Sequence, residues 1–231
     1  MKKIAIMGAM PEEIAPILKI VGTYTTHNYA GNSYYEAEYK GTLLFIAYSK
    51  IGKVFSTLSA TTLIEHFGCE LLLFSGVAGA INPKLKIGDL IVASKLSQHD
   101  LDITAFGYPV GYVPGGSVFV EADRELIELS KEVARELGNE IQEGIIATGD
   151  QFVHNSEVKE RIAKNFGADA LEMEGGSVAV VCHALGVPFF VLRAISDTAD
   201  MDASFSFDAF MESSAKLSAA FVMKMVDKLV G

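Results

Sequence analysis

The chain has 231 residues, of which 50% are hydrophobic and 21% are charged. An apolar fraction this high excludes an intrinsically disordered chain, and the length suits one domain that buries roughly 70–75% of its unfolded surface. The formal net charge of −10 repels phosphate backbones, so the composition disfavours a protein that binds nucleic acid or adheres to anionic membranes.

In chain order, apolar runs that suit strands alternate with patterns that suit helices. The patterns predict a strand at 3–7, a helix at 12–20, a hairpin at 34–39 and 42–48, a helix at 54–67 and a strand at 71–74. A tight turn at 75–80 and a strand at 87–93 follow. A helix at 123–137, a strand at 145–148, helices at 156–166 and 173–185, a strand at 189–195 and a helix at 213–230 complete the order. This alternation predicts an α/β fold whose large central sheet is covered by helices on both faces.

The absence of linkers, repeats and low-complexity tracts predicts that residues 1–231 form a single domain. Cys69 and Cys182 are too few for a disulfide framework or a zinc site, and their apolar surroundings predict buried thiols. The N-terminal apolar run superficially resembles a signal peptide, but it ends at Pro11 and is better interpreted as a strand. No stretch reaches the roughly 18 apolar residues of a membrane span, so we expect a soluble cytoplasmic protein.

Carboxylates stand at the ends of predicted strands that are far apart in the sequence. They are Glu12 and Glu13 after the first strand, Glu172 and Glu174 after a short apolar segment, and Asp197 after the strand at 189–195. Ligands of α/β sheets usually bind at the carboxyl ends of strands. A hydrolase that cleaves an acid-labile bond needs an acid for the leaving group and a base for water. Acids that stabilise helix N-termini would show the same pattern, so spacing leaves both interpretations open.

Other motifs indicate no cofactor. The glycines at 76 and 79 permit close backbone approach to a ligand, but neither they nor SKIGK at 49–53 match a dinucleotide or phosphate-binding fingerprint. The five histidines show no paired ligand spacing, so we expect no metal site, and no G-x-S-x-G elbow supports serine hydrolysis. His99, Asp100 and Asp102 form a local cluster that a polar loop or a subunit contact explains equally well.

Seven short motifs occur in the order found in one enzyme family and together cover nearly the whole chain. They are GAMPEE at 8–13, SKIGKV at 49–54, GVAG at 76–79, DITAFG at 102–107, TGDQF at 148–152, LEMEG at 171–175 and RAISD at 193–197. In these motifs the chain closely resembles the bacterial 5′-methylthioadenosine/S-adenosylhomocysteine nucleosidases. The resemblance implies the nucleoside phosphorylase/nucleosidase fold, a mixed sheet surrounded by helices, in a homodimer.

The resemblance implies hydrolysis of the N9–C1′ bond of an adenine nucleoside, with release of adenine and a 5-substituted ribose. Asp197 is similar to the general acid that protonates N7 of the purine, and Ser196 would help to hold it. Glu13 is similar to the base that activates water, with a rate contribution of about 10²–10⁴ for each such group. Glu174 matches the residue that binds the ribose hydroxyls, with Met173 packed against the sugar.

The resemblance also implies a substrate pocket built from two subunits. Phe152 would stack on the base, and the Val153 backbone would bind the adenine edge. The other substrate contacts would be Glu172, Ala78 and Gly79 in the same subunit, Met10, Ile51 and Phe207 in an apolar slot for the 5′-substituent, and Ile103, Phe106 and Pro114 from the partner subunit. Plain core packing is the alternative explanation for the apolar members of this set.

One absence bears on the choice between water and phosphate as nucleophile, and one residue departs from the pattern of the family. No arginine precedes Arg124, whereas phosphorylases of this fold hold phosphate with arginines. This absence favours hydrolysis, although Lys50 and Lys53 could replace the arginines. A phosphate-dependent purine nucleoside phosphorylase and a catalytically inactive nucleoside-binding protein therefore stay open. Val77 stands where some relatives carry serine, so a polar contact is missing there.

The breadth of substrates also stays open. The resemblance implies 5′-methylthioadenosine and S-adenosylhomocysteine, with 5′-deoxyadenosine and 6-amino-6-deoxyfutalosine as further candidates. SKIGKV together with TGDQF looks most like the family members from bacteria that cleave 6-amino-6-deoxyfutalosine on the way to menaquinone. No single residue decides this point.

Overall fold

The strand β5 (Leu71–Ala80) is buried along its whole length and organises the sheet of this computed structural model, which describes residues 2–199 and 203–231. One edge of β5 pairs in parallel with β10 (Phe189–Asp197). The other edge pairs first in parallel with β1 (Lys3–Gly8), up to Phe74, and then antiparallel with β9 (Ala170–Glu172) from Gly79 onward. Between β1 and β9, no described strand pairs with residues 75–78 on this edge.

The remaining strands extend the sheet to both sides of β5. Beyond β1 lie β4 (Thr42–Tyr48), which is parallel to β1, and then β3 (Asn32–Tyr39) and β2 (Thr25–Tyr29), each antiparallel to its neighbour. On the other side, β10 pairs antiparallel with β6 (Leu90–Gln98), and β6 pairs in parallel with β8 (Ile141–Thr148). Because β8 also pairs with β9, the strands β5, β10, β6, β8 and β9 form a closed ring, to which β7 (Val120–Glu121) is added beside β6.

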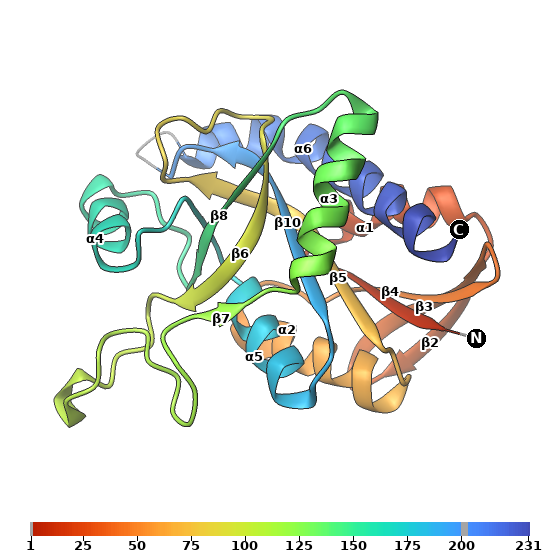
Figure 1. The fold of residues 1–231 in the computed structure, drawn as a ribbon, viewed down its shortest axis with the longest axis horizontal. Coiled ribbons are helices and arrows are strands. Elements are labelled where there is room, and N and C mark those ends of the chain that lie inside the picture. The colour runs from red at the N-terminus through yellow and green to blue at the C-terminus, as the bar shows by residue number, and fades with distance from the viewer. Residues whose placement is uncertain (1, 200–202) are drawn as a thin grey trace.

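Helices cover both faces of the sheet, as the alternation predicts (Figure 1). One face carries α1 (Pro11–Val21), α3 (Arg124–Leu137) and α6 (Ala203–Val230). The opposite face carries α2 (Lys53–Thr61), which continues into a π-helical turn (Thr62–His66), and α5 (Gly175–Leu185). The helix α4 (Ser156–Phe166) packs against β8 with a small apolar cluster of its own.

Side-chain alternation along the central strands builds two separate apolar cores. In β5, Leu72 and Phe74 pack on the side of α2 and α5, whereas Leu71 and Leu73 pack on the side of α1, α3 and α6. Successive residues of a strand face opposite sides of its sheet, so a strand covered on both sides is apolar throughout. This explains the continuous apolar runs that predict β5 and β10.

Most predicted elements are present, with ends that shift by a few residues. The helices predicted at 12–20, 123–137 and 156–166 are α1, α3 and α4, and the hairpin predicted at 34–39 and 42–48 is β3 and β4. Asp123 and Asn155 accept the N-terminal hydrogen bonds of α3 and α4, and Gly138 and Gly167 end these helices in the left-handed conformation.

Four predictions need correction. The tight turn at 75–80 is wrong, because β5 continues through this segment to Ala80. The strand at 87–93 lies further along as β6, and the helix expected from Met173 begins at Gly175. The helix expected at 213–230 begins at Ala203, and Phe207, Phe210 and Met211 already show the i, i+3, i+4 spacing of a helix. The pattern also does not predict β2, whose sequence TTHNY lacks alternating apolar residues.

The cysteine prediction is confirmed, since Cys69 and Cys182 are buried free thiols. Burial raises the pKa of both thiols to about 12. Among the described helices, none combines the length and the apolar character that crossing a bilayer requires.

The chain between β6 and β7, residues 99–119, projects away from the sheet (Figure 1). It contains a single turn of 3-10 helix (Thr104–Phe106), and the Phe106 side chain there is 80% exposed.

Candidate functional site

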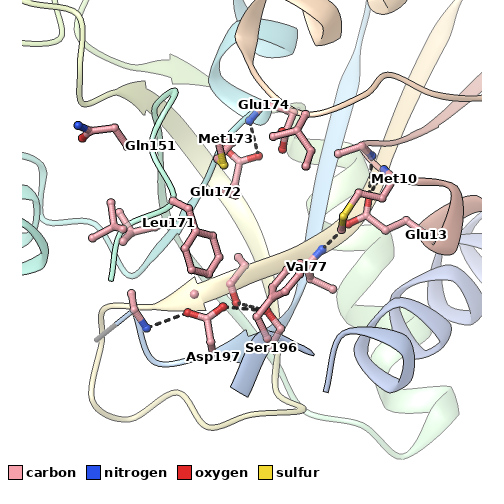
Figure 2. A pocket seen from close by; sticks show the side chains of 18 of the residues that line it. Met10, Glu13, Val77, Gln151, Leu171, Glu172, Met173, Glu174, Ser196 and Asp197 are labelled. Carbon is pink, nitrogen blue, oxygen red and sulfur yellow. Dashed lines mark hydrogen bonds between the residues drawn. The ribbon is translucent and has the colours of Figure 1, made fainter. Parts of the chain in front are cut away.

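A cavity of about 440 Å³ opens beside the edge of β5 that no described strand covers. Its described walls come from segments far apart in the sequence: Ala9 to Glu13 after β1, residues 77–79 of β5, residues 151–153 after β8, residues 171–174 at β9, and residues 196–199 at the end of β10. Figure 2 shows the carboxylates of Glu13, Glu174 and Asp197 around this space. The strand ends therefore meet as predicted.

The structure brings together every site residue that the sequence predicts within one subunit. The cavity is lined by Met10, Glu13, Ile51, Ala78, Gly79, Phe152, Val153, Glu172, Met173, Glu174, Ser196, Asp197 and Phe207. The partner subunit is predicted to contribute Ile103, Phe106 and Pro114. In this subunit the three residues lie in the projecting segment 99–119 and do not line the cavity. Sequence reasoning missed six lining residues: Ala9, Val77, Gln151, Leu171, Ala199 and Asp208. Ala9, Val77, Gln151 and Leu171 lie within the quoted motifs, next to predicted site residues, and this position was the signal that could have found them.

Glu13 closes the N-terminus of α1 and also faces the cavity. Its Oε2 accepts hydrogen bonds from the backbone amides of Ala9 and Met10, the latter at 3.0 Å. Its Oε1 accepts a hydrogen bond at 3.0 Å from the Val77 amide on the uncovered edge of β5. Burial raises the pKa of Glu13, against the opposing effects of the Arg193 charge and these amides. Glu13 therefore stabilises the N-terminus of α1 and also presents its carboxylate to the cavity. Its raised pKa makes it a better proton acceptor.

Asp197 ends β10 with both carboxylate oxygens held in place. Its Oδ2 accepts a hydrogen bond from Ser196 Oγ at 3.0 Å, and its Oδ1 accepts one from the Ala199 amide at 2.9 Å. The side chain lines the cavity although the residue is only 3% exposed. A carboxylate held this firmly in a cavity wall can transfer a proton at a fixed point.

Two glycines of β5 make room for these two acids. A Cβ atom on Gly76 would lie 2.7 Å from Glu13 Oε1, and one on Gly79 would lie 2.6 Å from Asp197 Oδ1. These glycines therefore serve close approach by side chains rather than a turn. Since each strand residue rises ~3.3 Å, the two acids cross β5 at points no more than about 10 Å apart.

Glu172 is buried, and hydrogen bonds reach both of its carboxylate oxygens. Thr148 Oγ1 donates to Oε1, while the amides of Glu174 and Gly175 donate to Oε2 at 3.1 and 2.6 Å. Arg193 Nη2 completes a buried ion pair with Oε2 at 2.8 Å. Glu172 thus holds the start of α5 while lining the cavity, and its predicted contact with a substrate stays a prediction.

Glu174 is a buried carboxyl group of the cavity with a raised pKa. Burial and, after it, the negative charge of Glu172 raise its pKa to about 8, against a hydrogen bond from the Gly52 amide. That amide donates to Glu174 Oε1 at 2.8 Å. At neutral pH, Glu174 is therefore largely protonated and can both donate and accept hydrogen bonds.

None of the described residues that line the cavity is a lysine or an arginine. Arg193 is 1% exposed and lies against Phe74, behind the wall. Lys53 Nζ binds Asp100 at 2.7 Å, and Lys50 Nζ donates to a backbone carbonyl and lies over an aromatic ring. The cavity wall is therefore acidic, without a cation of the kind that binds phosphate.

The rest of the wall is apolar and aromatic. Phe152 is 41% exposed, and its ring packs edge-on against Phe207 with centroids 5.6 Å apart. Met10, Ile51 and Val153 add further apolar surface. An exposed ring beside buried carboxylates suits a flat aromatic ligand with a polar portion.

Comparison with known proteins is consistent with this geometry. Residues 3–227 match the profile of the family described as the Phosphorylase superfamily. The chain is 57% identical to an aminodeoxyfutalosine nucleosidase of Campylobacter jejuni, over 99% of this chain and 100% of that protein. It superimposes on a futalosine hydrolase mutant of Helicobacter pylori with a TM-score of 0.97 and 50% identity, covering 99% and 100% of the two chains. A 5′-methylthioadenosine/S-adenosyl homocysteine nucleosidase of Campylobacter jejuni gives a TM-score of 0.95 and 56% identity, with 99% and 100% covered.

The Gly79→Ala substitution should destabilise the protein by about 1–3 kcal/mol, because the new Cβ would lie 2.6 Å from Asp197 Oδ1 and 3.1 Å from Ala199 Cβ. Chemical denaturation measures this change in the free energy of unfolding. Gly116→Ala is the matched control, since the nearest contact of its Cβ, a backbone oxygen at 3.6 Å, is ordinary. Equal stability of the two variants would contradict the clearance role of Gly79.

The Glu174→Gln substitution should change how stability depends on pH. Because burial lifts the pKa of Glu174 from 4.5 to about 8, the folded protein keeps a proton there that the unfolded chain releases. The stability contributed by this group is present below pH 4.5 and is lost as pH rises to about 8. As pH rises from 5 to 8, the Tm of the variant should therefore rise relative to that of the parent. The difference should be roughly 2–4 °C for each kcal/mol of stability that the parent loses. Parallel pH profiles of Tm would refute the assignment.

Proposed function

The chain belongs to the phosphorylase superfamily, and from this premise we propose that it is a nucleosidase that hydrolyses the N-glycosidic bond of adenine nucleosides and releases adenine. The observation that carries the proposal is the cavity beside β5, where Glu13, Glu174 and Asp197 converge without a lysine or an arginine among the described lining residues. The names of the similar enzymes from Campylobacter jejuni and Helicobacter pylori support the same reaction class.

The carboxylates divide the work of the reaction. Cleavage of the N9–C1′ bond leaves positive charge on the ribose and negative charge on the departing adenine. Asp197 protonates N7 of the purine, held for this by Ser196 and the Ala199 amide. Glu13 takes a proton from the water that attacks C1′, and its raised pKa suits a base.

Glu174 binds the ribose hydroxyls, and Met173 packs against the sugar. A protonated Glu174 can donate to one hydroxyl and accept from another, which matches its raised pKa. The carboxylates near the sugar stabilise the cationic transition state electrostatically. Phe152 stacks on the base, while the backbone of Val153, with Ala78 and Gly79, borders the adenine.

Water is the nucleophile in this proposal, and phosphate is not. An inorganic phosphate would face the acidic groups of the wall with no cation to hold it. Lys53 and Lys50, the lysines that could replace arginine, are engaged outside the cavity. A phosphorylase is therefore disfavoured, and an inactive nucleoside-binding protein would have no need of three convergent carboxylates.

The proposed substrates are 5′-methylthioadenosine, S-adenosylhomocysteine, 5′-deoxyadenosine and 6-amino-6-deoxyfutalosine. The apolar slot of Met10, Ile51 and Phe207 suits a thioether or an unsubstituted 5′-carbon. The similarity to aminodeoxyfutalosine nucleosidases supports the fourth substrate. These substrates place the cytoplasmic enzyme, without a cofactor, in methionine salvage and in menaquinone biosynthesis.

We further propose a homodimer whose partner subunit completes the 5′-slot. The helix α2 exposes Val54, Phe55 and Leu58 next to the cavity residue Ile51. Exposed apolar side chains gathered on one face mark an interface. In the dimer, Ile103, Phe106 and Pro114 of the partner subunit, from its projecting segment, close the slot.

In phosphate-free buffer, the purified protein should release adenine from 5′-methylthioadenosine, and added phosphate should not raise the rate. Asp197→Asn and Glu13→Gln should each lower kcat by about 10²–10⁴, because each removes a general acid or base. Adenine is measured by absorbance and the sugar product by mass. Formation of ribose 1-phosphate derivatives, or tight binding without adenine release, would reject hydrolysis.

A negligible rate on 6-amino-6-deoxyfutalosine under matched conditions would reject that substrate alone.

Sedimentation equilibrium should give the mass of a dimer. Phe106→Ala removes a ring that is 80% exposed in one subunit, so the fold of the subunit should stay unchanged. The KM for 5′-methylthioadenosine should rise by about ten-fold or more, since one well-packed aromatic anchor is worth over 1.4 kcal/mol at an interface. An active monomer with unchanged KM would exclude the shared slot.

A further inference from the structure

Lys53 stands at the N-terminus of α2, outside the cavity, and belongs to a closed hydrogen-bonded cycle. Its Nζ donates to Asp100 Oδ1 at 2.7 Å, and its backbone amide donates to Asp150 Oδ1 at 2.8 Å. The Asp150 amide donates in turn to Asp100 Oδ2 at 2.8 Å. Three segments separated by about 50 to 100 residues of sequence are thereby joined at one point, here named the Lys53 cycle.

The Lys53 cycle joins two walls of the cavity. Asp150 directly precedes Gln151, Phe152 and Val153, which line the cavity where the base is proposed to bind. Next to Lys53 in the sequence, the Gly52 amide donates to Glu174 Oε1 at 2.8 Å. The cycle therefore connects the base wall to the carboxylate proposed to bind the sugar.

Close backbone packing leaves these segments little freedom. A Cβ on Gly52 would lie 2.9 Å from Asp150 Oδ1, and Gly52 has a φ of +99°, which side chains rarely adopt. On the other side of the loop, a Cβ on Gly149 would lie 2.3 Å from His99 Nε2. The loop that starts at Gly149 is thus held between the His99 ring and the start of α2.

The ammonium group of Lys53 stabilises the ionised form of Asp100 in this cycle. The side chains of Lys53 and Asp100 are only 18% and 21% exposed, so water screens their ion pair weakly. Burial disfavours an ionised Asp100, but the hydrogen bonds from Lys53 and the Asp150 amide hold the pKa of Asp100 below its usual range. Without the ammonium group, Asp100 would keep only the hydrogen bond from the Asp150 amide among the contacts of the cycle.

We propose that Lys53 is a positioning residue of the nucleosidase, which sets the spacing between the base-binding loop and Glu174 through the Lys53 cycle. This inference rests on the proposed function, because it assigns Lys53 to the geometry of the same site. It also explains why the SKIGKV motif includes Lys53, a lysine that does not line the cavity beside β5. A displacement of about 1 Å between groups that hold a substrate can cost about 10²-fold in rate.

The test compares Lys53→Met with Lys40→Met. The two substitutions are chemically identical, and each removes an ion pair with an N–O distance of 2.7 Å, but Lys40 pairs with Asp227, away from the cavity. Lys53→Met should raise the KM for 5′-methylthioadenosine and the inhibition constant of adenine by about ten-fold and should lower kcat as well. Lys40→Met should change none of these values. Lys53→Arg should recover part of the adenine affinity, because a guanidinium can still bind Asp100.

A Lys53→Met variant that loses Tm but keeps the parental KM and adenine inhibition constant would show that the cycle only stabilises the fold, and would overturn the proposal. Sedimentation of the variant must give the parental mass, since an effect that comes only from lost assembly would overturn it too. If Lys53→Met fails to fold, Asp100→Asn takes its place, because it removes the charge that pairs with Lys53 and leaves a single acceptor oxygen for the two donors of the cycle. A parent protein that releases no adenine would instead refute the proposed function, while direct titration with adenine would still report on the loop.

Discussion

The break in strand pairing along β5 is the constraint on which the site depends. Where β1 has ended and β9 has not begun, the amides of β5 need partners other than a strand, because a buried amide without a hydrogen bond is costly. The Gly76 amide donates to Ser218 Oγ at 3.1 Å, and the Val77 amide donates to Glu13 Oε1 at 3.0 Å. The interruption thus creates the space for a ligand and also supplies a donor that orients one of its acids.

The electrostatics of the site follow from the packing of several acidic side chains around one buried arginine. Glu13, Glu172 and Glu174 are all buried, and Arg193 is the cation whose charge reaches them. Arg193 is committed to Glu172, so the remaining acids ionise against burial and mutual repulsion. The result is a cavity that favours a cationic sugar over an anion, which agrees with the choice of water as nucleophile.

The sequence predicts the parts of this protein whose signals are local. Strand ends, helix caps such as Asp123 and Asn155, and the acids after β1 and β10 are visible in short windows, and ordered motifs locate the lining of one subunit. The prediction of a turn at 75–80 is wrong because glycine occurs both in turns and where a side chain packs closely against a strand. At Gly76 and Gly79 the missing Cβ leaves room for side chains from distant segments. The link between Lys53, Asp100 and Asp150 is invisible in the sequence for the same reason, since only the fold brings the three together.

The closed ring of strands has a consequence for how the molecule behaves in concentrated solution. The ring strands β5, β10, β6, β8 and β9 pair with one another in a circle, and beyond β1 the sheet extends through β4 and β3 and ends at β2. Unpaired strand borders invite neighbouring molecules to add strands and form aggregates. Here the border strand has five mainly exposed residues, TTHNY, with no aliphatic side chain among them. A polar, short border of this kind gives a second molecule little aliphatic surface, which disfavours the addition of a strand at β2.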